Sequence, residues 1–219
     1  MSYFDTLYKP CLLDRLRATQ PTINLMDFLL AGWKFENNIN DIMGVYNLSR
    51  LGGTEETYVD FIVGKGVDLR NNDAYFIIPD GLVFNIGYTV SFYIDAPNLN
   101  SFQAVFGDKN NSFAGFLIDT NEKGLFFYSG SGSVSYVYYD VNAPMHISVI
   151  RTNGANYDIY VNSIYKGTSI VADSGFNLLF NSIGSRRLGR LPVSAIIDEF
   201  YIFNKALSQQ EIQLAMQGL

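Results

Sequence analysis

SAIIDEFYIFNKALSQQEI, residues 194–212, carries the clearest structural signal in this chain of 219 residues. Residues 196–203 are rich in isoleucine, phenylalanine and tyrosine, side chains that suit a pleated, half-buried surface, so they predict a β-strand with two faces. Ser208 and Glu211 have the spacing of a capping box, in which the serine accepts from an amide three residues on and the glutamate reaches back. The stretch therefore predicts a strand that leads into a short C-terminal helix.

The composition favours one sheet-rich globular domain. Hydrophobic residues make up 48% of the chain and charged residues only 16%, which argues against a disordered protein. The 17 phenylalanines and 15 tyrosines favour strands, because aromatic side chains fit a pleated surface. A β-sandwich of this length commonly forms a single domain.

Net charge, cysteine content and the absence of long apolar runs exclude or disfavour several classes of partner, cross-link and targeting segment. A net charge of −6 disfavours nucleic acid and anionic membranes. Cys11 is the single cysteine, so neither an intrachain disulfide nor a cysteine metal cluster can form. The first residues lack a basic region followed by an apolar run, and no apolar run reaches the length of about 18 residues that a membrane helix needs. We therefore expect a protein made in a cytoplasm, without a secretory signal or a transmembrane segment.

Alternating side chains predict strands through most of the chain. Apolar and polar residues alternate at 90–95, 145–149 and 157–161, with the period of a half-buried strand. Further strands are predicted at 104–107, 113–119, 124–128, 134–140 and 187–190. Many short strands separated by turn residues predict an all-β fold, an antiparallel sandwich.

Residues 1–31 differ from this pattern and predict a short helical N-terminal arm, followed by one domain over residues 32–219. A first helix ends at Pro21, and Asn24 can cap a second short helix that stops at Gly32. The arm cannot bury its apolar side alone, so it docks either on its own sandwich or on a partner. The predicted anchoring residues are Leu12, Leu13, Leu16, Phe28 and Leu29.

Six segments follow one another in a recognisable order. They are residues 32–35, 88–94, 145–149, 160–163, 188–190 and 197–199. In this order they resemble the strands of laminin-G-like domains, which are concanavalin A-like jelly rolls. Tyr93 and Met145 stand where tryptophan is common in that family, and Ser163 takes the turn position of a Tyr-Val-Asn-Gly motif. The resemblance implies a jelly-roll sandwich, and such domains mostly bind sugars or hold assemblies together.

Asp198 is the first candidate for a special role. On a regular strand it shares a face with Ile196 and Phe200, so it points inward, where an unpaired carboxylate is costly. In the jelly rolls that this chain resembles, an aspartate at this place joins oxygen ligands from near the first strand to hold a structural calcium, which implies Asn40 and Asp41 here. The alternative is that Asp198 accepts from amides of that loop or pairs with an arginine. No other cofactor is expected.

The sequence argues against catalysis. His146 is the single histidine, which excludes multi-histidine zinc sites and disfavours a catalytic triad, so we expect it to hold a hydrogen bond within a sheet. Laminarinase-like jelly rolls carry Glu-x-Asp-x-x-Glu on one strand, and no such run occurs here. Asp198 and Glu199 are expected to point to opposite faces. The protein is therefore expected not to be an enzyme.

The candidate ligand-binding residues are four tyrosines, Tyr128, Tyr136, Tyr138 and Tyr139. Tyr136 and Tyr138 share one face of a predicted strand. Sugar rings stack on aromatic faces, and tyrosine hydroxyls bind their polar edges. Alternatively, these side chains pack against the opposite sheet or a neighbouring subunit.

A non-catalytic structural or interaction protein of a bacteriophage virion is the first function that we expect. A head decoration, fibre or tail-associated subunit is made in the host cytoplasm and acts outside after lysis, so it needs no export signal. We expect its partners to be other virion subunits, reached through the arm, and further copies of itself, since closed symmetry makes a homo-oligomer such as a trimer the default. The alternative is a carbohydrate-binding module of an adhesion system, and a glycan-active enzyme is the third reading.

Overall fold

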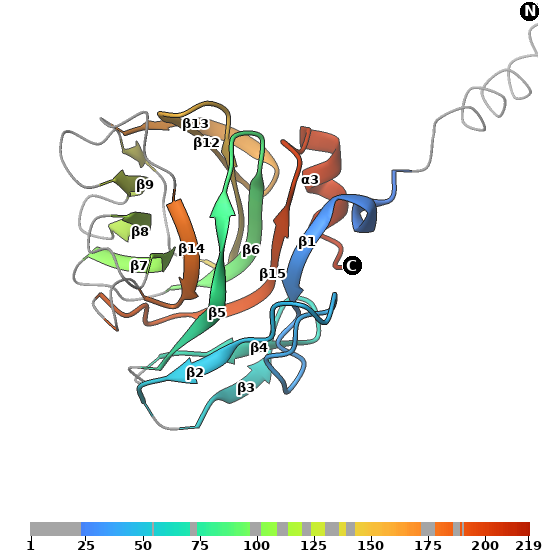
Figure 1. Cartoon of the computed structure of the whole chain (residues 1–219), viewed down its shortest axis with the longest axis vertical. Coiled ribbons are helices and arrows are strands. Elements are labelled where there is room, and N and C mark those ends of the chain that lie inside the picture. The colour runs from blue at the N-terminus through green and yellow to red at the C-terminus, as the bar shows by residue number, and fades with distance from the viewer. Residues whose placement is uncertain are drawn as a thin grey trace, which may run out of the picture.

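The computed structural model describes residues 23–53, 55–70, 74–96, 102–108, 114–119, 124–129, 136–138, 143–171, 178–185, 189 and 191–219. Two antiparallel β-sheets pack face to face over these residues, with a short C-terminal helix and a 3-10 turn near the N-terminus (Figure 1). The predicted all-β antiparallel sandwich is confirmed. No helix within these ranges is long and apolar enough to span a membrane.

Sheet A contains eight strands among the described residues. Its spatial order is β13 (Ile164–Ile170), β12 (Asn156–Val161), β11 (Met145–Arg151), β6 (Thr89–Asp95), β15 (Ile196–Phe203), β4 (Lys65–Asp68) and β3 (Thr57–Asp60). The remaining strand, β1 (Leu29–Trp33), also pairs with β15. The three alternating segments predicted as strands correspond to β6, β11 and β12.

Sheet B contains seven strands among the described residues. Its spatial order is β10 (Val137–Tyr138), β9 (Gly124–Ser129), β8 (Ala114–Asp119), β7 (Phe102–Gly107), β14 (Leu178–Ile183), β5 (Tyr75–Phe84) and β2 (Ser49–Leu51). The strands predicted at 104–107, 113–119 and 124–128 correspond to β7, β8 and β9. The segment predicted at 187–190 lies largely outside the described residues.

The core lies between the inner faces of the two sheets and is rich in aromatic rings. Phe92 and Phe200 of sheet A stack with centroids 5.0 Å apart, and Phe106 of sheet B meets Phe200 edge-on at 6.0 Å. Trp33 is fully buried, and its indole Nε1 donates to the carbonyl oxygen of Tyr46 at 3.0 Å. These large side chains supply much of the apolar burial that holds the sheets together.

The N-terminal part of the described chain begins with a 3-10 turn, η1 (Leu25–Phe28). Asn24 caps this turn, and its side chain accepts from the amide of Met26 at 3.2 Å. The predicted cap is therefore confirmed, because a short asparagine side chain satisfies an amide that the first turn leaves without a backbone partner.

The helix predicted to follow this cap ends early, and the prediction that it runs to Gly32 is wrong. β1 begins at Leu29 and pairs antiparallel with β15. This pairing buries Ala31 and Trp33 in the core, and such tertiary contacts override a local helix signal. The strand therefore crosses the boundary placed between residues 31 and 32.

Two of the predicted anchoring residues lie on the outer face of sheet A. Phe28 and Leu29 pack in an apolar cluster with Tyr201 of β15 and Ile212 of the C-terminal helix α3 (Gln209–Ala215). The described end of the arm therefore docks on its own domain. The other three predicted anchoring residues, Leu12, Leu13 and Leu16, lie outside the described residues.

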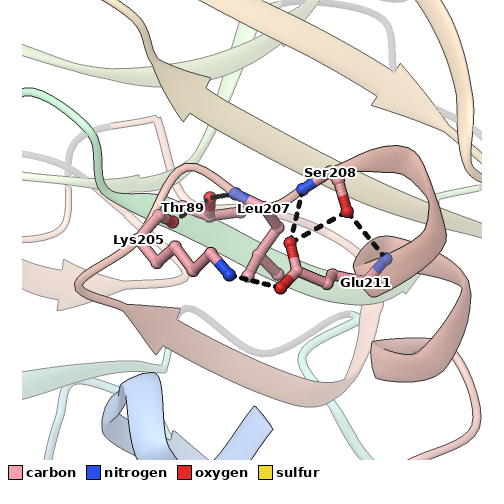
Figure 2. Close-up of polar contacts among 5 residues, drawn as sticks. All are labelled: Thr89, Lys205, Leu207, Ser208 and Glu211. Atoms are coloured by element: carbon pink, nitrogen blue, oxygen red, sulfur yellow. Dashed lines mark hydrogen bonds and ion pairs between the residues drawn. The ribbon is translucent and has the colours of Figure 1, made fainter. Parts of the chain in front are cut away.

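Figure 2 shows how α3 is joined to sheet A. The Ser208 hydroxyl accepts from the amide of Glu211 at 3.3 Å, and the Glu211 carboxylate accepts from the amide of Ser208 at 2.8 Å. Lys205 pairs with the same carboxylate at 2.5 Å. The buried Thr89 hydroxyl donates to the Lys205 carbonyl at 2.7 Å and accepts from the amide of Leu207 at 3.0 Å. The predicted capping box and terminal helix are confirmed.

Candidate functional site: the aromatic outer face of sheet B

Aromatic side chains gather on the outer face of sheet B, the face turned away from the core. In β9, Phe127 packs in the core while its neighbour Phe126 lies on the opposite side. In the same way Val137 of β10 is part of the core, and Tyr136 and Tyr138 on either side of it stack outside the sheet. The two-residue period of strands places these rings together.

We call Phe102, Phe126, Tyr136 and Tyr138 the aromatic face. Their ring centroids follow one another at 5.9 Å from Phe102 to Phe126, 4.6 Å from Phe126 to Tyr136 and 6.2 Å from Tyr136 to Tyr138. Tyr138 is 69% exposed and Phe102 is 43% exposed, whereas Phe126 is only 2% exposed. Exposed rings with phenol hydroxyls can stack on the apolar face of a sugar and bond its polar edge.

A glycine allows this arrangement. A Cβ atom added at Gly124 of β9 would lie 2.6 Å from Cδ1 of Tyr136, closer than carbon atoms approach one another without a shift. The ring of Tyr136 therefore lies directly over the backbone of β9. This position then holds Tyr136 against Phe126 and alongside Tyr138.

The structure places three of the four predicted tyrosines. Tyr136 and Tyr138 share one face, with 22° between their ring planes, as expected from their spacing. Tyr128 is half-buried and packs against the outer-face cluster of Ala104, Leu117 and Phe126. Tyr139 lies outside the described residues. The placed tyrosines therefore pack on the outside of sheet B and not against the opposite sheet.

The sequence-based prediction missed two rings, Phe102 and Phe126. In Gly124–Ser129 two phenylalanines are adjacent, so the period of a strand says that one of them faces outward but not which one. The pairing of β8 with β9 fixes this register in the structure. Phe102 precedes the strand start that was predicted at residue 104.

The carboxylate of Asp41, one of the predicted calcium ligands, is already occupied. One oxygen accepts from the amides of Gly32 at 2.8 Å and Met43 at 3.2 Å. The other accepts from the amides of Val45 at 3.0 Å and Tyr46 at 2.9 Å. Asp41 therefore organises the loop that follows β1, because four backbone amides satisfy both oxygens of its side chain.

The donor set does not fit the implied structural calcium. Asp198 accepts from the backbone amides of Glu199 at 2.7 Å and Val63 at 3.3 Å, and the backbone amide of Asn40 donates to Oδ1 of Asn38 at 2.9 Å. In the described part of the chain, no three histidine, cysteine, aspartate or glutamate side chains come together as a metal site. Backbone amides therefore bond to the carboxyl group of Asp198, which is the type of partner that the alternative to calcium predicted. These amides belong to β15 and to the turn before β4, and not to the loop that follows β1.

Asp198 and Glu199 are the two carboxyl groups of β15, and the pKa of each is raised. Burial raises the pKa of Asp198 to about 8, and the neighbouring charge of Glu199 adds to this rise. Burial also raises the pKa of Glu199 to about 7, against the opposing effect of Lys34. Both shifts follow from the removal of water around a charge, which favours the neutral form. These groups lie on sheet A and not on the aromatic face.

His146 forms a hydrogen bond within sheet A, as expected. Its Nε2 lies 2.8 Å from the hydroxyl of Ser91, which also lies 3.1 Å from the hydroxyl of Ser148. The imidazole is 1% exposed, and burial lowers its pKa to about 3. Its Nδ1 has no hydrogen-bond partner among the described residues, so the orienting carboxylate of a catalytic triad is missing there.

Several solved structures share this fold. Domain 4 of AbnA, an extracellular arabinanase from Geobacillus stearothermophilus, in complex with arabinotriose, matches with a TM-score of 0.70 and 21% identity, over 87% of this chain and 98% of that one. The binding domain of Paraclostridial Mosquitocidal Protein 1 matches with a TM-score of 0.58 and 19% identity, over 88% of this chain and 52% of that one. Trypanosoma rangeli sialidase, in complex with the inhibitor DANA, matches with a TM-score of 0.62 and 12% identity, over 90% of this chain and 33% of that one. At these identities the matches establish the fold alone.

A protein-family model gives the closer classification. No curated protein sequence matches the chain at a significant level. The model that matches residues 70–213 describes the concanavalin A-like lectin/glucanases superfamily. These residues include the aromatic face, the strands β5 to β15 and the start of α3. The chain therefore belongs to the concanavalin A-like lectin/glucanases superfamily.

Proposed function

We propose that this protein is a non-catalytic binding module that contacts a glycan through its aromatic face. The observation that carries the proposal is the stacked pair Tyr136 and Tyr138, which continues through Phe126 to the exposed ring of Phe102. Two of these rings, Tyr138 and Phe102, are exposed on one face of the sheet, where a ligand can reach them. The match to an arabinanase domain in complex with arabinotriose supports a saccharide as that ligand.

A binding role fits the chemistry better than a catalytic one. Glycoside hydrolysis needs two carboxyl groups on either side of the scissile bond. On the described part of the outer face, Asp119 is 1% exposed and lies beside the rings in the sheet register. Asp198 and Glu199 have perturbed pKa values but are buried in sheet A. Neither arrangement offers an accessible carboxyl pair.

A glycan array with matched variants tests the binding role. Tyr138→Ala removes the most exposed ring of the aromatic face, and we expect about a tenfold loss of affinity for the glycan that the wild type binds, the equivalent of one stacked contact. Tyr165→Ala is the control, because Tyr165 is 52% exposed but lies on β13 in sheet A. If the folded wild type binds no glycan, the proposed function is wrong.

A place in a bacteriophage virion is the finer proposal, and it draws support from the position of η1, the described end of the arm. η1 and α3 pack together on the outer face of sheet A, whereas the aromatic face belongs to the outer face of sheet B (Figure 1). A subunit held through residues that precede η1 would keep the aromatic face accessible. We therefore propose that residues 1–22 attach the protein to other virion subunits or to further copies of itself, as a homo-oligomer.

Deletion of residues 1–22 tests this attachment and keeps all of η1 and β1. We expect the shortened protein to keep the melting temperature of the full chain but not to be incorporated into particles when it is produced together with the other virion proteins. Its mass in solution, measured by light scattering, would also fall if the arm joins copies of the chain. Normal incorporation of the shortened protein would overturn the attachment role.

A further inference from the structure

We propose that Asn153 and Gly154 form a site of spontaneous deamidation, at which the chain itself converts Asn153 into aspartate or isoaspartate. The two residues lie in the turn that joins β11 to β12, outside both strands. This inference goes beyond the proposed glycan function and does not depend on it. It rests on the Asn-Gly sequence, on the exposure of the asparagine, and on two backbone amides that bond to its side-chain oxygen.

The sequence of the turn supplies an unhindered nucleophile. In deamidation, the backbone nitrogen of the following residue attacks the carbon Cγ of the asparagine side chain, and a side chain on that residue obstructs the approach. Gly154 has no side chain, and its backbone has the freedom that closing a small ring requires. Asn153 is the only asparagine in the sequence that is followed by glycine.

The reacting groups are accessible to solvent. Asn153 is exposed and Gly154 is only half-buried. The turn is closed by the amide of Thr152, which donates to the carbonyl oxygen of Asn156 at 3.0 Å. The amide of Gly154, in contrast, has no hydrogen bond within the described part of the chain. A base from solvent can therefore take the proton of the Gly154 nitrogen without breaking a hydrogen bond of the fold.

Two backbone amides are already in place to stabilise the intermediate. The amides of Ala155 and Asn156 both donate to Oδ1 of Asn153, each at 2.9 Å. When the Gly154 nitrogen attacks Cγ, negative charge develops on Oδ1. Donors that are fixed at this distance before the reaction stabilise such a charge, as in an oxyanion hole. The turn therefore favours the attack beyond what the Asn-Gly sequence alone provides.

Asn38 provides a comparison within the same chain. Its Oδ1 accepts from one backbone amide, that of Asn40, at 2.9 Å. The residue that follows it is Ile39, whose branched side chain hinders attack by the backbone nitrogen. Asn38 is exposed like Asn153, so exposure does not distinguish the two asparagines. We therefore expect Asn38 to remain intact while Asn153 reacts.

The conversion consumes only water and releases ammonia. A bond forms between the Gly154 nitrogen and Cγ of Asn153, the bond between Cγ and Nδ2 breaks, and the proton lost by the nitrogen leaves with the ammonia. The product is a succinimide ring. One water molecule then opens the ring. Cleavage at Cγ gives an aspartate, whereas cleavage at the main-chain carbonyl carbon of residue 153 gives an isoaspartate.

The two products should affect the turn differently. Each adds one negative charge to the net charge of −6, because the new carboxyl group is ionised near neutral pH. An aspartate keeps an acceptor oxygen for the amides of Ala155 and Asn156. An isoaspartate lengthens the backbone by one atom and so displaces the carbonyl of Gly154, to which the buried Arg151 donates through Nη2 at 3.5 Å.

Incubation of the full chain in a mildly alkaline buffer, followed by peptide mass spectrometry, tests the inference. We expect the peptide with Asn153 to acquire the mass of an acid in place of an amide and to contain isoaspartate, whereas the peptide with Asn38 stays unchanged. Gly154→Ala should slow the reaction several-fold. Asn153→Gln should prevent it, because glutamine must close a larger ring.

A comparison of the native protein with the same chain unfolded in urea isolates the effect of the two amides. The native protein should react about tenfold faster, since one fixed donor contributes about 10²–10³ in a water-excluded site and exposed donors contribute less. A slower reaction in the native protein would mean that the turn protects Asn153 and would overturn the inference. Equal rates would also overturn it, because the Asn-Gly sequence would then act without the fold. Neither result affects the glycan function.

Discussion

The backbone amide of Glu199 donates to Oδ1 of Asp198 at 2.7 Å, at a point where the strand β15 is irregular. The register of β15 shifts between Asp198 and Tyr201, and Glu199 has a φ of 48°. This bulge leaves two consecutive carboxyl groups buried and close enough to affect each other. Sheet A therefore contains groups that favour their protonated forms near neutral pH.

The protein should lose stability as the pH rises through the range of about 7 to 8. The folded pKa of Asp198, about 8, lies above its unfolded value of about 4, so its contribution is full below the unfolded value and is lost as the pH passes the folded one. Urea unfolding between about pH 6 and pH 9 should show this fall, and Asp198→Asn should reduce it by about 2 kcal/mol. Asp60→Asn, at an exposed position, is the control. An unchanged pH slope in Asp198→Asn would contradict the raised pKa.

His146 should remain neutral throughout the physiological range. Burial lowers its pKa to about 3, and its Nε2 bonds to Ser91. Because it is the single histidine of the chain, one imidazole signal in an NMR spectrum reports on it alone. We expect no change of that signal between about pH 5 and pH 8, whereas an unburied histidine titrates near 6.5. A midpoint near 6.5 would mean that the imidazole is reached by water in solution and is not buried in sheet A.

Loss of the Thr89 hydroxyl should destabilise the protein more than loss of the helix cap at Ser208. Thr89→Val removes a buried hydroxyl and leaves the amide of Leu207 and the carbonyl of Lys205 without that partner, which should cost about 2 kcal/mol of unfolding free energy. Ser208→Ala removes an exposed cap and should cost about 1 kcal/mol. Thr57→Val, on the edge strand β3, is the control, and urea denaturation measures all three. An equal cost for Thr57→Val and Thr89→Val would contradict the role of the buried hydroxyl.

Local signals in the sequence predicted some elements of the fold, and tertiary pairing determined others. The capping box of Ser208 and Glu211 could be predicted because its bonds join residues close in sequence. The change from helix to strand at Leu29 could not, because it depends on pairing with β15 at the other end of the chain. The bulge at Glu199 is likewise invisible to a two-residue period.

In the candidate site, too, some features follow from local sequence spacing and others depend on long-range strand pairing. The spacing of Tyr136 and Tyr138 was enough to place both rings on one face of a strand. The spacing could not show that Phe102 lies in line with Tyr138, because that alignment depends on the pairing of four strands. Strand register is a long-range property, since a slip of one residue would turn each side chain to the other face.

Gly124→Ala should impair the aromatic face without removing any ring from it. The added Cβ atom would lie 2.6 Å from Cδ1 of Tyr136, so the ring must move away from β9. Tyr136 would then lose its close contact with Phe126, which has a centroid distance of 4.6 Å, and its parallel arrangement with Tyr138. Because the ring is half-exposed and can shift outward, we expect a loss of only about 1 kcal/mol in unfolding free energy.

Gly124→Ala should lose more free energy of glycan binding than free energy of unfolding. We expect its glycan affinity, measured by calorimetry, to fall about tenfold, because the stacked surface depends on the position of Tyr136. Tyr136→Ala in the background of Gly124→Ala separates the two effects. If the glycine acts only by placing the ring, the double variant should bind as weakly as Tyr136→Ala alone, and the two losses should not add. Additive losses would mean that Gly124 affects the ligand through the backbone of β9 and not through Tyr136.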